Sequence, residues 1–519
     1  MKEVQWLQSL CLFEELSVIK RILTVLLCTA LILSLFGCKG NLKSGELIIE
    51  EGDSEINLAM FDVDTLNPIR TKSQSVSEIM SLVYEPLFTF DEKLNPIPCL
   101  GEIVSVSADG LTARLMLKKN VMWQSGVPLV AEDVIYTINE IKKGESLYLH
   151  NVKSISDMAI DADGSIMLTF SKPNMNLEGL LSFPIIRNGS AAEIDKNPDG
   201  TGVFSVEEKS ATTIKMVADK ARAKGSVSAI NVDIMRSAVA CLNAFETNKI
   251  DVITSAVVDL GEKTPAGEIS TNLYTSNRMT FLGFNCTLEK YKTPYLRLAI
   301  NEIVDRGEIA AKASYGLATE CRLPFNPSSS IYKETEGPDI DVSGAMLKAG
   351  YTKTDGKYLA ENGEQALVDI IVSEETAGKV AVAKMVAMQL EMDGIKANVN
   401  ALPFDEYKRR ITAKNFDIFV GEVEMPDNLC PGFLTDEGNF LGYQDTQMSE
   451  AVYGMKLARG EAMKEAVLNY ERIFSVNPPL VPLFFANEGV VYKKNISGIT
   501  MPVFYNNLKG LEKVYFTTA

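Results

Sequence analysis

Apolar residues recur at two different spacings along this chain. In GSIMLTF, residues 164–170, every second residue is apolar, and this alternation predicts a half-buried β-strand. In LVAEDVIYTINEIKKG, residues 129–144, the spacing is three or four residues, which predicts an amphipathic helix that ends at Gly144. The stretch 380–402 predicts a helix, a turn at Asp393–Gly394 and then a strand. Because strand and helix patterns alternate throughout, the sequence predicts an α/β fold.

The spacing also predicts which residues of these elements are buried. In the strand they are Ile166, Leu168 and Phe170; in the first helix Val130, Val134, Ile138 and Ile141; in the second helix Val382, Val386 and Leu390.

Composition narrows the functions that are open to the chain. With 519 residues, 46% of them hydrophobic, it is long enough for two or three domains around a large core. A net charge of −17 argues against nucleic-acid binding, which needs a basic surface. The chain has one histidine, His150, and it lies in a polar-ended stretch that predicts a surface or loop position. Zinc sites and histidine-based catalytic triads need histidine, often more than one. We therefore expect no metal and no cofactor, and no catalysis that depends on histidine, although carboxylate-pair chemistry stays open.

The N-terminus has the pattern of a secretion signal. Lys20–Arg21 precede the apolar run 22–37, which is short for a spanning helix, and Cys38 follows directly. The ending LFGC resembles the bacterial lipobox, with Phe36 bulkier than usual, so Cys38 is the expected lipidation site. An uncleaved anchor helix is the alternative. We expect the other cysteines to be mostly small buried residues.

An acidic cluster stands in GEVEMPDNLCPGFL, residues 421–434. Its carboxylates are Glu422, Glu424 and Asp427, and they follow the buried-strand pattern FDIFV. In open α/β sheets, ligand clefts lie at the carboxyl ends of strands. The cluster could be a catalytic pair, a metal site, a dock for a cation or a solvated loop.

Several longer stretches resemble one family in the expected order. TLNPIRTKSQSVSEIMSLVYEPLFTFDEKLNPIPCLGE and ADGLTARLMLKKNVMWQSGVPLVAEDVIYTI resemble the family 5 extracellular solute-binding proteins, which are the oligopeptide, dipeptide and nickel receptors of ABC importers. NPDGTGVFSV, LNAFETNKIDVI, FLGFNC, TPYLRLAINEIVDRGEI and NPPLVPLFF resemble later landmarks. The resemblance covers roughly residues 45–500 and implies a type II periplasmic-binding-protein fold, with two lobes around a ligand cleft and an accessory domain.

The resemblance also implies the boundaries of the signal peptide, the tether and the domains. They are an N-terminal extension and signal peptide at 1–37; a lipidated cysteine and tether at 38–44; a discontinuous lobe I at 44–75, 196–275 and 490–519; an accessory domain at 76–195; and lobe II at 276–489.

The implied function is reception rather than catalysis. The chain would be a monomer on the outer face of the cytoplasmic membrane, anchored by its lipid, that captures peptides and delivers them to ABC transporter permease subunits. The same fold could instead take an oligosaccharide, an opine or a metal chelate. An extracellular enzyme, or a sensor or adhesin without a transporter, is a further alternative.

Family members place specific residues on the ligand. Asp427, four residues before Pro431, matches the aspartate that holds the peptide's amino terminus, with a solvated loop or helix cap as the alternative. Glu424 stands where peptide binders commonly have tryptophan, which points to a cationic ligand. The expected ligand-binding residues are Asp427, the backbone of Val423, Glu424 and Met425, the first-lobe residues Ser73 and Gln74, and the aromatic residues Phe484 and Phe485. We expect core packing for at least one of these two phenylalanines, and structural roles for Trp123, Asn285 and Arg297.

Overall fold

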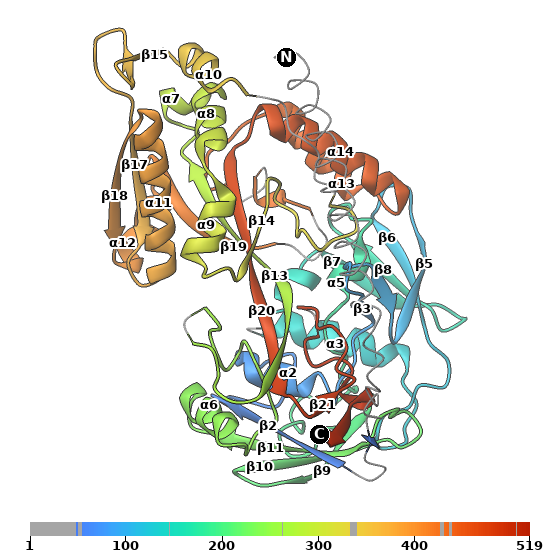
Figure 1. Ribbon diagram of the computed structural model, residues 1–519. Coiled ribbons are helices and arrows are strands. Elements are labelled where there is room, and N and C mark those ends of the chain that lie inside the picture. The colour runs from blue at the N-terminus through green and yellow to red at the C-terminus, as the bar shows by residue number, and fades with distance from the viewer. Residues whose placement is uncertain are drawn as a thin grey trace, which may run out of the picture. The chain divides into compact units, whose positions relative to one another are not determined.

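The computed structural model describes residues 48–49, 54–144, 146–261, 263–332, 340–425, 430–434, 439–504 and 506–518 (Figure 1). The chain forms two compact units, residues 1–50 with 517–519, and residues 51–516. In the first unit, β1 (Ile48–Ile49) pairs antiparallel with residues 517–518. The helices and the larger sheets described below belong to the second unit.

A four-stranded sheet lies in the segment predicted as lobe I. Its order is β2 (Ser54–Phe61), β11 (Val227–Met235), β10 (Thr213–Ala218) and β9 (Phe204–Lys209). Strands β2 and β11 run parallel, and the other pairs are antiparallel. Helices α2 (Gln74–Met80) and α6 (Ala238–Glu246) contact β2. The segment also contains β21 (Ile496–Ser497), η2 (Leu511–Lys513) and the start of β22 (Tyr515–Thr518).

A second four-stranded sheet lies in the predicted accessory segment. Its antiparallel order is β5 (Gly101–Val106), β6 (Thr112–Leu117), β8 (Ile166–Phe170) and β7 (Ile155–Ile160). The hairpin of β3 (Phe88–Phe90) and β4 (Pro96–Pro98) precedes it. The helices of this segment are α3 (Ala131–Lys143), α4 (Leu149–Val152) and α5 (Leu177–Leu180).

The largest sheet is mixed and has seven strands. Its order is β12 (Val252–Thr254), β20 (Leu480–Lys493), β13 (Ile269–Phe284), β19 (Ile418–Glu424), β17 (Leu367–Ser373) and β18 (Lys396–Leu402), and β14 (Ala318–Glu320) also pairs with β20. Strands β13 and β20 are long and lie side by side (Figure 1), with their register shifting between Thr275 and Met279.

The helices that accompany this sheet are α7 (Glu289–Lys292), α8 (Tyr295–Ile303), α9 (Arg306–Ala313), α10 (Val342–Lys348), α11 (Ala377–Asp393), α12 (Phe404–Thr412), α13 (Thr446–Lys456) and α14 (Glu461–Val476). The hairpin β15 (Tyr351–Thr354) and β16 (Lys357–Ala360) and the short helix η1 (Gly432–Leu434) complete it.

Two large hydrophobic cores divide the second unit. One core contains buried residues between Met279 and Phe485, within the predicted lobe II. The other core runs from Ile56 to Val514 and includes residues of both predicted lobe I and the accessory segment. Val76 of α2 and Trp123 belong to this second core together with Ile230. The accessory segment therefore shares its hydrophobic core with the lobe beside it.

The elements read from the apolar pattern are present. Strand β8 buries Ile166, Leu168 and Phe170, and α11 ends at Gly394 in the left-handed conformation (φ 106°) before β18. One residue was wrongly placed on the buried face, because Val130 is the residue before the first turn of α3 and is 43% exposed. Its N–H donates to Asp133 Oδ2 at 2.9 Å, which fixes the helix start at Ala131.

Histidine and cysteine positions agree with the sequence pattern. His150 is exposed on the short helix α4. Cys241, Cys286, Cys321 and Cys430 are buried and Cys99 is partly buried, all as free thiols. Across the described ranges, no helix combines the length and the apolar composition that crossing a membrane requires.

Candidate ligand-binding site

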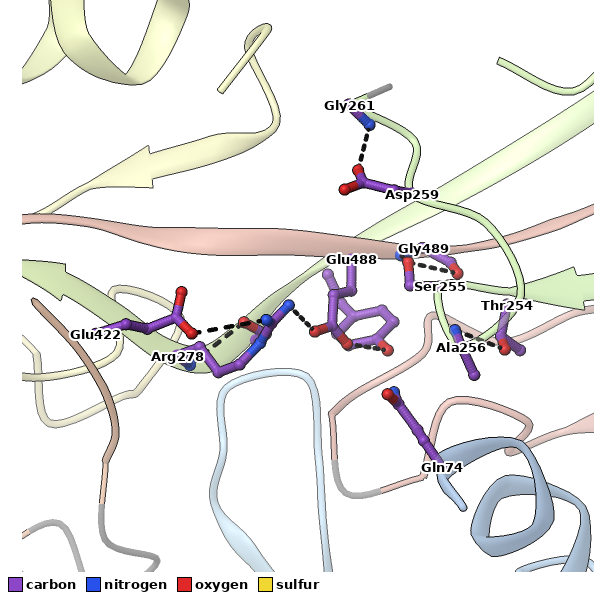
Figure 2. Close-up of polar contacts among 12 residues, drawn as sticks. Gln74, Thr254, Ser255, Ala256, Asp259, Gly261, Arg278, Glu422, Glu488 and Gly489 are labelled. Atoms are coloured by element: carbon purple, nitrogen blue, oxygen red, sulfur yellow. Dashed lines mark hydrogen bonds and ion pairs between the residues drawn. The ribbon is translucent and has the colours of Figure 1, made fainter. Parts of the chain in front are cut away.

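A chain of polar contacts lies where β13 and β20 run side by side (Figure 2). Arg278 NH2 donates to Glu488 Oε1 at 2.7 Å, and Tyr274 OH donates to Glu488 Oε2 at 3.0 Å. Burial lowers the pKa of Arg278, but the carboxylates of Glu488 and Glu422 outweigh burial and leave that pKa raised. Burial and the nearby carboxylates also raise the pKa of Tyr274, so its hydroxyl keeps its proton. Glu488 therefore holds a cation and a neutral donor in fixed positions.

The polar chain continues from the long strands to helix α2. Glu78 Oε1 accepts hydrogen bonds from Asn507 Nδ2 at 2.7 Å and from Gln74 Nε2 at 3.2 Å, and Thr254 Oγ1 donates to Glu78 Oε2. Asn507 Nδ2 is also 3.4 Å from Tyr274 OH. Burial raises the pKa of the Glu78 carboxyl to about 7, although its three donors oppose this shift. The network thus joins α2, β12, the C-terminal segment and both long strands.

The two predicted first-lobe residues differ in how they face the site. Ser73 is 8% exposed, its hydroxyl donates to Phe61 O at 3.1 Å, and its N–H donates to Thr71 Oγ1 at 3.1 Å. Gln74 is exposed, and its side chain extends from α2 toward the side on which Glu488 lies (Figure 2). Of the two, Gln74 is the residue whose side chain is open to solvent.

Strand β19 carries the acidic cluster further into the sheet than the sequence pattern predicted. Pairing with β13 continues to Arg278↔Glu424, so Glu422 and Glu424 lie within the strand and not after it. Met425 N donates to Asn277 O at 2.8 Å, and Asn277 Nδ2 donates to Met425 O. Both backbone polar groups of Met425 are therefore bonded to Asn277 and do not support the predicted ligand-binding role.

The backbone of β19 alternates between its two sides. Since Met425 bonds across to β13, the antiparallel ladder also directs the N–H and C=O of Val423 to β13, and those of Glu422 and Glu424 to the opposite side. Val420 O fits this alternation, because it accepts from Tyr407 OH at 2.7 Å. Strand β17 pairs with β19 only at Ile418 and Phe419. Within the described parts of the chain, no strand pairs with residues 420–424 on that side.

The predicted aromatic residues are part of the lobe II core. Phe484 is 6% and Phe485 0% exposed, and they lie across from Thr280 and Met279 in the β13–β20 ladder. The two rings therefore pack inside the protein, which agrees with the expected core packing for at least one of them. Asp427 and Cys38 lie outside the described residues.

The residues expected to be structural do make structural contacts. Asn285 Nδ2 donates to Lys414 O and Phe416 O, and Arg297 Nε donates to Tyr291 O at 3.0 Å. Trp123 is 1% exposed, and its Nε1 donates to Asp133 Oδ2 at 3.0 Å. These side chains hold loops and helices together.

The charged residues at the centre of the site were not predicted from the sequence. Glu488 stands in LVPLFFANEGVVYK, a strand that is otherwise largely apolar, whereas Arg278 stands in ISTNLYTSNRMTFLGF, a strand of mixed polarity. A charge inside an apolar strand is costly unless it is paired, so a signal was available for Glu488 alone. The pairing itself joins residues 210 positions apart and could not be read from the chain.

A cavity of about 160 Å³ lies beside the same long strands. It is lined by Glu92, Leu94, Leu273, Tyr274, Thr275, Ser328, Asn487 and residues 501–504. The described residues contain no group of three or more His, Cys, Asp or Glu side chains placed to hold a metal ion.

The family model described as "Bacterial extracellular solute-binding proteins, family 5 Middle" matches residues 95–429. The chain belongs to this family. It therefore has the type II periplasmic-binding-protein fold, and it is a solute-binding protein for import by ABC transporters and not an enzyme.

Individual relatives of this solute-binding protein are distant. The oligopeptide-binding protein AppA of Bacillus subtilis is 22% identical over 518 residues, covering 92% of this chain and 95% of AppA. The structure of AppA in complex with a nonapeptide has a TM-score of 0.60 at 17% identity and covers 90% of this chain and 100% of that chain. A nickel ABC transporter structure from Bacillus halodurans has a TM-score of 0.74 at 19% identity, covering 89% and 100%. NikZ from Campylobacter jejuni in complex with Ni(L-His) has a TM-score of 0.62 at 19% identity, covering 89% and 99%.

Proposed function

We propose that this solute-binding protein captures peptides between its two lobes and delivers them to an ABC importer. The lobes and the accessory domain have the boundaries given above, and the protein acts as a monomer. Cys38 carries the lipid that holds it on the outer face of the cytoplasmic membrane.

The observation that carries the proposal is the strand edge at residues 420–424. Among the strands that the structure describes, only β13 pairs with this part of β19, and the backbone groups of Glu422 point to the side away from β13. An extended peptide can pair with such an edge, so that main-chain hydrogen bonds supply affinity for many sequences. Gln74, which is exposed at the start of α2, supplies a contact from the first lobe.

The amino terminus of the peptide supplies a charged contact. Asp427 takes the amino terminus, because a carboxylate that meets an ammonium group in a closed cleft forms a charge-assisted hydrogen bond. AppA, which resembles this chain over nearly its whole length, is named an oligopeptide-binding protein. This resemblance supports peptide as the ligand.

Native mass spectrometry of the protein as purified from cells tests the ligand. The protein would begin at residue 38 with Cys38→Ser, so that no lipid obscures the mass. A heterogeneous excess that matches short peptides is the expected result. A mass without excess that shifts with an oligosaccharide or a nickel chelate, and never with peptide mixtures, would overturn the proposal.

A further inference from the structure

The two large hydrophobic cores meet away from the long strands as well as along them. Strand β20 runs from one core to the other, with Phe485 in the lobe II core and Val490 in the core shared by lobe I and the accessory segment. Leu177 of α5 belongs to the shared core, whereas Met455 of α13 and Ala458 after it belong to the lobe II core. Because each core is packed as a unit, lobe II can turn against the shared core about β13 and β20.

A polar contact joins α5 to the loop between α13 and α14. Met175 N donates to Lys456 O at 2.9 Å, and Arg459 Nη2 donates to Glu178 Oε1. The Glu178 side chain is 12% exposed and that of Arg459 is 33% exposed, so water reaches this ion pair only in part. Each half of the contact is fixed to its own core, and a rotation of one core against the other therefore takes the contact apart.

The contact is not fully satisfied. Within the described chain, Arg459 Nη1 is buried and has no hydrogen-bond partner. A buried donor without a partner costs free energy, and this donor returns to water when the contact opens. The ion pair with Glu178 favours the contact and the unpartnered donor opposes it, so the contact can open and form again.

The contact and the candidate ligand site lie on opposite sides of the long strands. In Figure 1, α11, α12 and β17 lie on one side of β13 and β20, and α13, α14 and the accessory sheet lie on the other. The strand edge faces α12, whose Tyr407 OH donates to Val420 O. The Arg278 side chain is 48% exposed and Gln74 is exposed, so the lobes leave the site open to solvent. Closing the lobes over the site therefore draws the loop between α13 and α14 away from α5.

We propose that the contact of Met175 and Glu178 with Lys456 and Arg459 is a counter-contact to ligand binding. It holds the lobes in the open arrangement and comes apart when they close, so these residues set the affinity without touching the ligand. This inference rests on the proposed function. Because a ligand that binds the closed arrangement has to offset the loss of the contact, a weaker contact raises the apparent affinity.

Glu178→Gln and Arg459→Met each remove the ion pair of the counter-contact. Titration calorimetry with a defined mixture of short peptides should give an affinity about threefold to fivefold higher for each variant, which is the effect of one partly exposed ion pair. The double variant should gain no more than either single variant, because both changes remove the same interaction. Unchanged or lower affinity in both single variants would overturn the counter-contact.

Arg222→Met is the matched control. Arg222 Nη2 donates to Glu85 Oε1 at 2.7 Å, and the side chains of the pair are 40% and 23% exposed. This pair joins the accessory segment to lobe I, which share one core, so the opening and closing of the lobes should not affect it. Its loss should leave the affinity at the wild-type value, and a gain equal to that of Glu178→Gln would overturn the counter-contact.

Distances between the lobes test the counter-contact without any ligand. Spin labels at Asn243→Cys of α6 and Lys384→Cys of α11 report the separation by pulsed EPR, in protein that carries Cys38→Ser and Cys99→Ser. Arg459→Glu places two carboxylates against each other, and the population at shorter distances should then increase relative to the unmodified contact. If it increases but no peptide binds, the proposed function fails and the counter-contact stands. An unchanged distance distribution overturns the counter-contact whatever the peptides do.

Discussion

Glu78 and Asn507 are 429 residues apart in sequence and are joined by a 2.7 Å hydrogen bond. Through this bond the C-terminal segment is tied to helix α2 beneath the candidate ligand site. Thr254 and Gln74 complete the donors around the Glu78 carboxyl group, and Glu488 is the nearby charge that disfavours its ionisation.

The Glu78 carboxyl should make the stability of this protein depend on pH. Burial raises its pKa from 4.5 to about 7, so between these values the folded chain keeps a proton that the unfolded chain releases. The contribution of this group to the free energy of unfolding then falls as pH rises from about 4.5 to about 7. The melting temperature of the Glu78→Gln variant, measured relative to that of the wild type, should therefore be higher at pH 8 than at pH 5. Glu391→Gln, on the exposed face of α11, is the control, and an equal difference at both pH values would contradict the prediction.

Trp123→Phe should destabilise the protein without weakening ligand binding. The change removes the Trp123 Nε1 donor from Asp133, a buried carboxylate whose oxygens also accept from Val130 N and Asn188 N. Loss of such a buried bond costs about 1–3 kcal/mol of unfolding free energy. Urea denaturation measures the loss, and calorimetry measures ligand affinity. A large drop in affinity with unchanged stability would show that Trp123 touches the ligand.

Asp427→Asn should weaken the binding of peptides with a free amino terminus by about tenfold or more, since a hydrogen bond to a charged group contributes about 1.5–3 kcal/mol. Amino-terminally acetylated peptides are the matched probe, and the substitution should change their affinity little. Titration calorimetry with both forms provides the measurement. Equal losses for the two forms would assign Asp427 a structural role.

Cys38→Ser should release the protein from the membrane. A lipidated cysteine fractionates with membranes, whereas the serine variant has no thiol to carry the lipid and should leave the cell surface. Fractionation followed by mass spectrometry of the membrane-bound form checks this, with the buried Cys241→Ser as control. A Cys38→Ser protein that stays fully membrane-bound would support the uncleaved anchor helix.

Local sequence patterns predicted local structure. Features that depend on pairing between residues far apart in the sequence could not be predicted in this way. The helix ending at Gly394 and the alternation in β8 follow from spacing and turn chemistry within a few residues. Val130 was wrongly placed on the buried face of α3, because the start of this helix at Ala131 depends on the bond from Val130 N to Asp133. The position of Glu422 inside β19 depends on pairing with β13, which is more than 130 residues away in sequence. The same holds for Arg278 and Glu488, whose contact only the folded sheet creates.

The shared core constrains how this chain can evolve. Val76 and Trp123 of the accessory segment pack in one core with Ile56 and Ile230 of the neighbouring sheet. A recombination event at residue 76 or 196 would therefore join two halves of one interlocking interior from different parents, and cores tolerate such mismatched volumes poorly. Viable chimaeras between relatives should have their crossovers where β13 and β20 enter the separate lobe II core, so that lobe II is the part exchanged as a unit.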